Sequence, residues 1–296
     1  MGFHVLTRQK IILYLLHRVS GALSPTSLMK LAFLLRHETV LSADPSFYDF
    51  VPYKYGPFSF TMYRDLSDLR ERGYLAACRD VQLAASAATL DHDSTGDLPV
   101  RTKLAVEDVL ARYGQMDQSS LVRDVYRRYP WFAVNSILPE RADIPVVRPR
   151  QAPCAVYTCG YQGRSVDAFF NLLLTRGIEV VLDVRRNAIS RKYGFSGRRL
   201  AELCGKLGLK YQHLPSLGIP SSERAGLSDL ASYQRLLDWY ERTVLPDRTA
   251  QVNALAHLMS QQPAVLVCVE RHADCCHRGR LAGSVSIASG LAVVHL

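Results

Sequence analysis

The chain has 296 residues, of which 48% are apolar and 21% are charged, and this length suits two domains. The composition excludes an intrinsically disordered chain, a collagen-like repeat and a disulfide-knotted scaffold. Its 36 Lys and Arg exceed its 27 Asp and Glu by nine, which favours anionic partners and nucleic acid first. Because the seven cysteines are an odd number, we expect free thiols and a cytoplasmic protein. Because no run of about eighteen apolar residues occurs, we expect no membrane segment.

The first half is predicted to be mainly helical. Ser24 before Pro25 is an N-cap with proline at the first helical position, so a helix begins there. Further on, Met62, Leu66 and Leu69 share one face of a later helix. The helices expected in this half cover residues 8–19, 25–38, 60–72, 103–113 and 119–129.

A winged helix is the fold that the order of these elements favours. Segments 74–77 and 99–102 are expected to pair as the two strands of a wing, on either side of an exposed loop at 84–97. The segment MKLAFLLRHE, followed by YKYGPF in a turn and then by a helix, resembles the Panacea or SocA-like antitoxin domain (domain of unknown function 4065) over residues 28–75. That resemblance implies contact with a protein or a nucleic acid rather than catalysis.

Two interpretations stay open for the helix at 60–72. Its arginines would contact DNA phosphates, whereas the carboxylates that alternate with them indicate a solvated face of i,i+4 ion pairs. The later segment YRRYPWF, residues 126–132, interleaves basic and aromatic side chains as a base-stacking surface does. For that segment we favour the alternative, a helix end whose aromatic rings dock on the core.

A proline-rich stretch separates the two halves. LPERADIPVVRPRQAP contains four prolines and no sustained periodicity, which is typical of an extended linker. We therefore expect domains at residues 1–137 and 154–296, joined by a linker at 138–153. Residues 1–150 hold 19 basic and 16 acidic side chains, a net +3, and residues 151–296 hold 17 and 11, a net +6. The second domain therefore carries most of the positive charge.

The second half alternates short apolar strands with helices. Strands are expected at 155–161, 178–184, 209–214 and 264–270, and helices at 165–176, 199–207, 233–244, 248–260 and 276–284. This alternation predicts a parallel sheet with helices on both faces. The predicted fold class is therefore α/β: a C-terminal parallel-sheet domain of three layers, preceded by a mainly α, winged-helix-like domain.

Polar side chains follow the predicted strands, and we expect them in one cleft, because the ligand site of a parallel sheet lies beyond the carboxyl ends of its strands. Charged groups at the ends of apolar strands are costly unless they contribute to function. The strand at 155–161 ends in Tyr161, and the strand at 178–184 leads to Asp183, Arg185, Arg186 and Ser190. The strand at 264–270 leads to Cys268 and Glu270, and then to His277 and Arg278. His213 ends the remaining strand, at 209–214, where it either faces the cleft or caps the strand through a backbone hydrogen bond.

Four motifs in this half resemble, in order, those of the domain of unknown function 488 family. They are TCGYQGRS, VLDVRRNAISRKYGFS, KYQHLPSLG and VCVERHADCCHRGRLAG, and the resemblance covers residues 155–296. Because the biochemistry of that family is not settled, the resemblance implies an architecture and a site rather than a reaction.

The stretch at 185–199 holds six basic residues and no carboxylate. Arg191 and Lys192 lie in it, with Tyr193 and Phe195 beside them. Guanidinium groups hold phosphates bidentately and aromatic rings stack on bases, so we favour phosphate or nucleic-acid binding over a merely solvated loop.

Cys268 closes an apolar strand and precedes a polar loop. Neighbouring arginines and a helix N-terminus would lower the pKa of its thiol and make it a nucleophile. Glu270, two residues on, would act as general acid or base. The alternative, a buried cysteine that merely fills the core, is equally favoured.

A metal site is the third interpretation of this segment. Cys268, His272, Cys275, Cys276 and His277 put five ligand types within ten residues, but the spacing is unusual for zinc. Adjacent Cys276 and His277 are also expected to point in different directions. We therefore predict no metal ligand and no cofactor, with zinc or another divalent metal as the alternative.

Together these features predict a nucleic-acid-binding protein that is also an enzyme. We expect a hydrolase or lyase that acts on modified or damaged bases of DNA or on its backbone. Its expected role is antiviral genome defence or repair. The first domain would contact a protein partner. The alternatives are a non-catalytic DNA-binding regulator or antitoxin, and a Cys-dependent enzyme on a small anionic metabolite. The predicted catalytic residues are Asp183, Glu270 and Cys268, and the predicted substrate contacts are Tyr161, Arg185, Arg186, Ser190, Arg191, Lys192, Tyr193, His213, His277 and Arg278.

Overall fold

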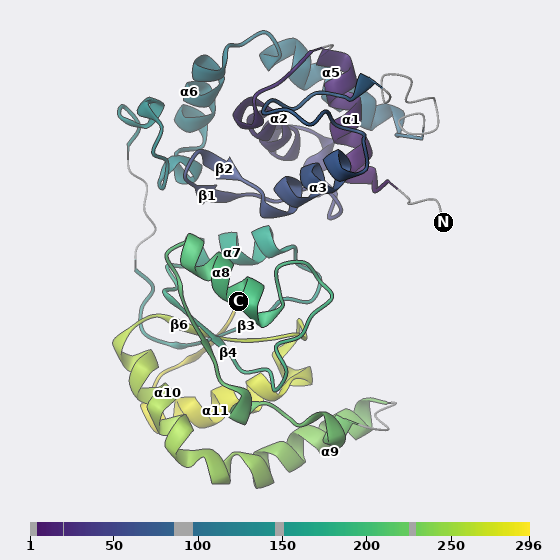
Figure 1. Cartoon of the computed structure of the whole chain (residues 1–296). Helices are drawn as coiled ribbons and strands as arrows, with labels where there is room; N and C mark the ends of the chain where they lie inside the picture. Colours follow the sequence, from purple (N-terminus) through teal and green to yellow (C-terminus); the bar gives the residue numbers. More distant parts are fainter. Residues whose placement is uncertain (1–4, 20, 86–96, 146–150, 225–228) are drawn as a thin grey trace. The chain divides into compact units, whose positions relative to one another are not determined.

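The structure is a computed structural model that describes residues 5–19, 21–85, 97–145, 151–224 and 229–296. The chain divides into two compact units, Met1–Arg148 and Pro149–Leu296, which are described separately (Figure 1). Among the described residues, no helix combines the length and the apolar character needed to cross a bilayer.

The first unit is mainly helical, as predicted. Ser24 caps its second helix, since its hydroxyl accepts a hydrogen bond from the Ser27 backbone N–H at 3.0 Å. The predicted apolar face of the third helix is buried at Met62 and Leu69. The second helix is buried over the eight consecutive residues 28–35, because other helices pack around it. The helices are α1 (Thr7–Val19), α2 (Pro25–Glu38), α3 (Phe60–Glu71), α5 (Val100–Tyr113) and α6 (Gln118–Arg128).

The predicted wing is wrong. Residues 100–102 form the first turn of α5, because Pro99 has no N–H for a strand ladder and suits a helix start. Leu75 instead forms an antiparallel bridge with Leu83, so the segment after α3 turns back on itself much earlier in the chain. A hairpin of β1 (Val51–Tyr53) and β2 (Gly56–Phe58) overlaps the predicted turn at 53–58 and begins two residues before it. Most of the predicted loop at 84–97 lies outside the described residues.

The predicted linker begins too early. Pro139–Arg141 form a 3-10 turn, and Ile144 is buried in the core of the first unit. The apolar side chain of Ile144 therefore anchors this stretch to the first unit, whose packing extends beyond the predicted boundary at 137. Residues 146–150 of the linker lie outside the described residues.

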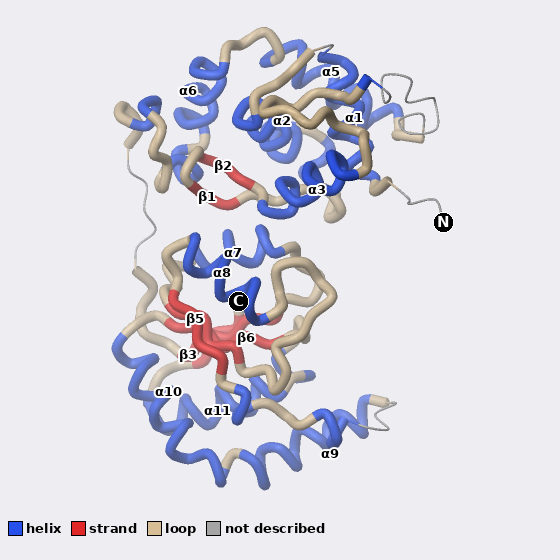
Figure 2. The backbone as a smooth tube through the Cα atoms, in the orientation of Figure 1, coloured by secondary structure: helices blue, strands red, loops and turns tan. Residues whose placement is uncertain are grey.

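The second unit is a five-stranded parallel sheet covered on both faces, which confirms the predicted three-layer α/β fold. The strand order is β5-β4-β6-β3-β7. α7 and α8 lie on one face, and α10 and α11 on the other (Figures 1 and 2). The strands are β3 (Val156–Gly160), β4 (Val180–Asp183), β5 (Lys210–His213), β6 (Ala264–Cys268) and β7 (Val293–His295), and the helices are α7 (Val166–Thr175), α8 (Gly197–Lys206), α9 (Leu230–Trp239), α10 (Thr249–Gln261) and α11 (His277–Ser289).

The edge strand β7 was not predicted, because it has only three residues and follows a helix directly. It pairs with β3 in parallel. The other four strands lie within the predicted ranges.

The crevice between the ends of β4 and β6 is a topological switch point. β4 leads into α8 on one face of the sheet, whereas its neighbour β6 leads into α11 on the other. Asp183 pairs with Val267, and Gly160 of β3 pairs with Cys268, so these strands end at the same level. Ligands of open α/β sheets bind in such a crevice.

Candidate functional site: a basic hollow and a buried Cys–His cluster

The residues at the strand ends do not form the single cleft that was predicted. Successive side chains of a strand point to opposite faces of its sheet. Asp183 contacts Tyr211 on the side of α8, whereas Val184 and Cys268 belong to the core that α10 and α11 cover. The sheet therefore separates the predicted residues into two groups.

Asp183 and Arg185 form a closed ion pair on the α8 side, and Arg185 is only 3% exposed. The Asp183 carboxylate accepts hydrogen bonds from Arg185 Nε at 2.7 Å and Nη2 at 2.5 Å, and from the Tyr211 hydroxyl at 2.8 Å. Burial alone would lower the pKa of Arg185, but the hydrogen bond and the charge of Asp183 raise it, so the guanidinium stays charged. This pair is satisfied internally.

Three predicted substrate contacts are instead buried: Arg185 and Arg278 donate to backbone carbonyls, and Tyr161 contacts Arg185 and Phe195. Arg185 Nη1 donates to the Tyr161 hydroxyl at 3.0 Å and to the Phe195 carbonyl at 2.8 Å. The Tyr161 ring stacks on Phe195 with centroids 4.1 Å apart, so both rings are buried and Phe195 offers no surface to a base. Arg278 is buried as well and donates to the Glu270 and Arg271 carbonyls at 2.6 and 3.0 Å. Because Arg185, Tyr161 and Arg278 are buried, their side chains are not exposed to a ligand at the surface.

A basic hollow of about 440 Å³ lies at the carboxyl ends of β4 and β5. Its lining includes exposed Arg186 and Arg198 together with His213, and it includes no carboxylate. It is built from the segment after β4, the first turns of α8 and the strand β5; the lining residues are Arg186, Asn187, Ala188, Ile189, Gly197, Arg198, Ala201, Tyr211 and His213.

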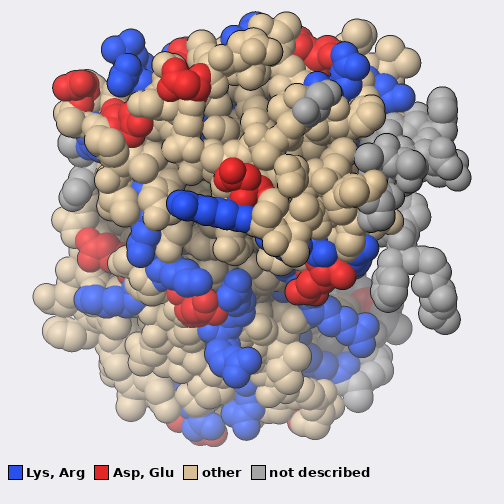
Figure 3. All heavy atoms as spheres, turned by 45° about the horizontal axis from the view of Figure 1, so that its top comes forward, with Lys and Arg blue, Asp and Glu red and all other residues tan. Residues whose placement is uncertain are grey.

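This charge is local. Figure 3 shows one face of the molecule, on which Lys and Arg side chains lie with Asp and Glu side chains interspersed. A site for anions has to be defined by particular residues, as the basic hollow is.

His213 both lines the basic hollow and contacts a backbone carbonyl, so the structure contains features of both interpretations of this residue. Its Nε2 lies 2.8 Å from the Arg185 carbonyl oxygen. Because a carbonyl only accepts, Nε2 carries a hydrogen and donates it. The backbone after β4 is also held by a close approach of Gly218. A side chain at Gly218 would clash, since its Cβ would lie 2.1 Å from the Arg186 backbone nitrogen.

The remaining residues of the basic stretch do not line the hollow. Lys192 Nζ donates to the Tyr161 carbonyl at 3.3 Å, and burial lowers the pKa of Lys192. The Tyr193 hydroxyl accepts a hydrogen bond from Arg199, and the Ser190 hydroxyl accepts one from the Lys192 backbone N–H. Arg191 is exposed. These residues brace the loop, and the predicted aromatic stacking surface is largely internal.

On the other face of the sheet, Cys268, Cys276 and His277 form a buried Cys–His cluster. Their three possible ligand atoms lie within 4.8 Å of one another. The Sγ atoms of both cysteines lie 3.9 Å from Nδ1 of His277. Glu270 Oε2 lies 3.4 Å from Cys268 Sγ and borders the cluster.

The expectation that Cys276 and His277 diverge is therefore wrong. Cys276 has an extended backbone, with φ −143° and ψ 139°, and is the N-cap of α11, whereas His277 is the first helical residue. This change of conformation turns two adjacent side chains toward the same point. His272 and Cys275, two other predicted ligand types, are exposed and lie outside the cluster.

The surroundings of the cluster control its charges. His277 Nε2 lies 3.0 Å from the Val184 carbonyl oxygen and must donate to it, so Nδ1 of the neutral ring presents a lone pair to the two sulfurs. Burial raises the pKa of Cys276 well above its usual value, and the neighbouring Cys268 adds to this effect. Burial also pushes the pKa of Glu270 up, but the hydrogen bonds from the Cys276 thiol and from the Glu270 backbone, together with the nearby charge of Arg224, outweigh it, so that the pKa is lowered.

The hollow and the cluster meet at two consecutive residues. The Val184 carbonyl accepts from His277, and the Arg185 carbonyl lies in hydrogen-bond contact with His213. The end of β4 therefore connects the basic hollow on one side of the sheet with the Cys–His cluster on the other. No local sequence pattern indicates this link, because His213 and His277 lie 28 and 93 residues further along the chain than the carbonyl groups that they contact.

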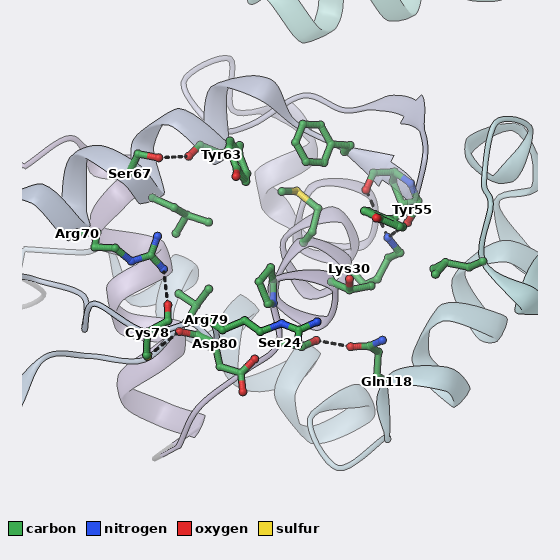
Figure 4. A pocket seen from close by; sticks show the side chains of 18 residues that line it. Ser24, Lys30, Tyr55, Tyr63, Ser67, Arg70, Cys78, Arg79, Asp80 and Gln118 are labelled. Atoms are coloured by element: carbon green, nitrogen blue, oxygen red, sulfur yellow. Dashed lines mark hydrogen bonds between the residues drawn. The ribbon is translucent and has the colours of Figure 1, made fainter. Parts of the chain in front are cut away.

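The first unit contains a separate pocket of about 820 Å³ (Figure 4). Lys30 of α2 is 1% exposed and donates from Nζ to the Tyr55 carbonyl at 2.5 Å. Burial lowers the pKa of Lys30 to about 7. Sequence reasoning missed this residue, although a single lysine inside the apolar run of α2 is a usable signal.

Two segments of the first unit have interpretations that the sequence left open, residues 126–132 and α3. Tyr126 is buried in the core, and Trp131 packs against it, which confirms that the aromatic side chains of 126–132 dock on the core. On α3, Arg64 lies 3.6 Å from Asp68 in an i,i+4 ion pair, and Arg70 donates to the Ala76 carbonyl. These contacts match the solvated helix face, and contact of α3 with DNA stays a prediction.

Comparison with known proteins bears on the second unit. No curated protein and no solved structure matches this chain. The resemblance of residues 28–75 to the antitoxin domain stays a prediction. The family described as Domain of unknown function DUF488 matches residues 165–285, a range that contains the basic hollow and the Cys–His cluster in full and supports the resemblance of the second unit to that family.

Proposed function

We propose that the second unit binds nucleic acid, DNA first, and that the basic hollow holds backbone phosphates. The observation that carries this proposal is the lining of the hollow, where Arg186, Arg198 and His213 converge without a carboxylate. Guanidinium groups match phosphate oxygens bidentately, and an exposed guanidinium is free to do so. Because Arg185 is buried in its pair with Asp183, it supports the hollow rather than contacting phosphate.

The start of α8 adds to the attraction for anions. This ten-residue helix begins at the hollow with Gly197, and its N-cap Ser196 makes no side-chain capping hydrogen bond. The first-turn N–H groups of a helix and its dipole both favour a negative group at that end. A phosphate in the hollow would therefore meet two arginines and a helix N-terminus.

We further propose that the protein acts on the bound DNA, as a hydrolase or lyase in genome defence or repair. Cys268 is 1% exposed, so direct attack by its thiol is disfavoured, and the proposed acid or base is the partly exposed Glu270. The position of Glu270 supports this role, because Glu270 follows β6 and the hollow follows β4, and β4 and β6 are the two neighbouring strands of the topological switch point. In this proposal the first unit is an interaction module for a protein or nucleic-acid partner.

Binding is tested by fluorescence anisotropy with labelled single-stranded DNA, double-stranded DNA and RNA over a range of salt concentrations. We expect Arg186→Ala and Arg198→Ala each to weaken binding and to reduce the slope of log K against log salt by about 1. Arg176→Ala is the matched control, because Arg176 is exposed between α7 and the amino end of β4, whereas the hollow lies at the carboxyl end of that strand. Absence of binding at low salt, or equal affinity of all three variants, refutes the proposal.

The reaction is tested separately by incubating the full chain with modified and unmodified oligonucleotides and resolving the products by mass. Strand cleavage or base loss by the wild type, lost in Glu270→Gln while binding is retained, supports an enzyme. Binding without any product identifies the non-catalytic regulator instead. Product formed equally by Glu270→Gln refutes the assigned role of Glu270.

A further inference from the structure

We propose that the Cys–His cluster is a metal site in which Cys268, Cys276 and His277 bind one zinc ion. The inference does not depend on nucleic-acid binding, because it rests on the three buried side chains and their spacing. Two thiolates and one imidazole are ligands that zinc prefers, and three protein ligands leave a fourth position open.

The distances in the cluster fit a tetrahedral ion. Zn–S bonds of about 2.3 Å and Zn–N bonds of about 2.1 Å at a tetrahedral angle place a sulfur and a nitrogen ligand about 3.6 Å apart. Both cysteine Sγ atoms lie 3.9 Å from His277 Nδ1. Each sulfur–nitrogen distance therefore has to contract by only a few tenths of an ångström, and all three ligand atoms already lie within 4.8 Å of one another.

His277 is oriented as a metal ligand requires. Its Nε2 donates to the Val184 carbonyl at 3.0 Å, which places the hydrogen on Nε2 and the lone pair on Nδ1. A backbone carbonyl in this position is the usual outer partner of a metal-bound histidine, since it fixes both the tautomer and the ring direction. The Tyr240 ring, 5.4 Å away in edge-to-face contact, fixes the plane of the imidazole further.

Positive groups surround the place where the thiolates would lie. Cys276 is the N-cap of α11, a thirteen-residue helix whose N-terminus favours a negative side chain. Arg278 is buried, and none of the ion pairs found in the described parts of the chain includes it. Its Nε is a buried donor without a partner among the described residues. A zinc ion with two thiolates has no net charge, so the metal site would place no additional charge beside the buried Arg278.

Glu270 lies beside the fourth position. Its Oε2 is 3.4 Å from Cys268 Sγ, and its Oε1 is 4.0 Å from Arg224. The Glu270 carboxylate therefore borders the cluster next to Cys268, although it is not one of the three residues whose ligand atoms all lie within 4.8 Å of one another. An open position next to a carboxylate is the arrangement of catalytic rather than structural zinc sites.

The test measures the metal content of the purified full chain. We expect about one zinc per chain by plasma mass spectrometry, at least a tenfold loss in Cys268→Ser, Cys276→Ser and His277→Ala, and retention in Glu270→Gln. Cys275→Ser and His272→Ala are matched controls, because these residues are exposed and lie outside the cluster.

A second measurement covers variants that fail to fold. Wild-type protein stripped with a chelator is titrated with cobalt(II), and we expect a thiolate-to-cobalt absorption band, together with the visible bands of tetrahedral cobalt, that saturates at one equivalent and is displaced by zinc. Zinc content unchanged in Cys268→Ser and Cys276→Ser relative to Cys275→Ser overturns the site. So does a wild-type chain that binds neither zinc nor cobalt through sulfur. Neither outcome bears on DNA binding at the hollow.

Discussion

The change Asp183→Asn tests whether the Asp183–Arg185 pair supports the hollow as a structural element. The carboxylate accepts four hydrogen bonds, from the backbone N–H, Nε and Nη2 of Arg185 and from the Tyr211 hydroxyl. An amide of the same shape offers one acceptor oxygen and turns two N–H donors toward the guanidinium. Arg185, which is 3% exposed, then remains as an uncompensated buried charge.

The expected loss is large. Removing one partner of a buried ion pair costs about 3–5 kcal/mol, because the remaining charge keeps its desolvation penalty. With a urea m-value of about 2 kcal/mol per molar, a loss of about 4 kcal/mol lowers the midpoint of unfolding by about 2 M. The two tryptophans allow the second unit to be followed alone, since Trp131 packs in the first core and Trp239 in the second. Urea unfolding is therefore measured by fluorescence in a Trp131→Phe background.

Two further variants sharpen the result. Tyr211→Phe removes one hydrogen bond to the carboxylate and is expected to cost about 1 kcal/mol. The double change Asp183→Asn with Arg185→Met removes the unpaired charge and is expected to recover part of the stability. If Asp183→Asn loses no more than Tyr211→Phe, or if the double variant is less stable than the single one, the structural role of the pair is refuted.

Two other predictions concern local packing and charge. Burial lowers the pKa of Lys30 to about 7, from 10.5 in the unfolded chain. Between pH 7 and pH 10.5 the folded first unit therefore binds fewer protons than the unfolded chain. Its free energy of unfolding should rise over this pH range by up to about 1.4 kcal/mol per pH unit. Urea unfolding of Lys30→Met at several pH values should show a flatter dependence, and equal slopes would contradict the buried lysine. Gly160→Ala places a Cβ 1.8 Å from the Glu270 carbonyl oxygen and should lower stability by about 1–3 kcal/mol, whereas Gly205→Ala on α8, with open space around it, should not. Thermal unfolding compares the two, and equal melting temperatures would refute the close approach.

The sequence by itself determined the local structure. The N-cap Ser24, the apolar face of Met62 and Leu69 and the apolar strands of the second half each depend on neighbours within a few residues. The three-layer α/β fold follows from the alternation of those elements. Even the wing failed for a local reason, since Pro99 favours a helix start over a strand.

The tertiary structure decided which polar side chains are accessible and which partners they meet. Arg185 and Arg186 are adjacent in the sequence, yet Arg185 is buried against Asp183, whereas Arg186 lies beyond the end of β4 and is exposed in the hollow. Cys268 and His277 meet only because β6 and the start of α11 converge beside Val184. The surplus of positive charge was visible from composition alone. Its division between a buried scaffold and an exposed anion site depends on contacts between residues far apart in the chain, which no local pattern encodes.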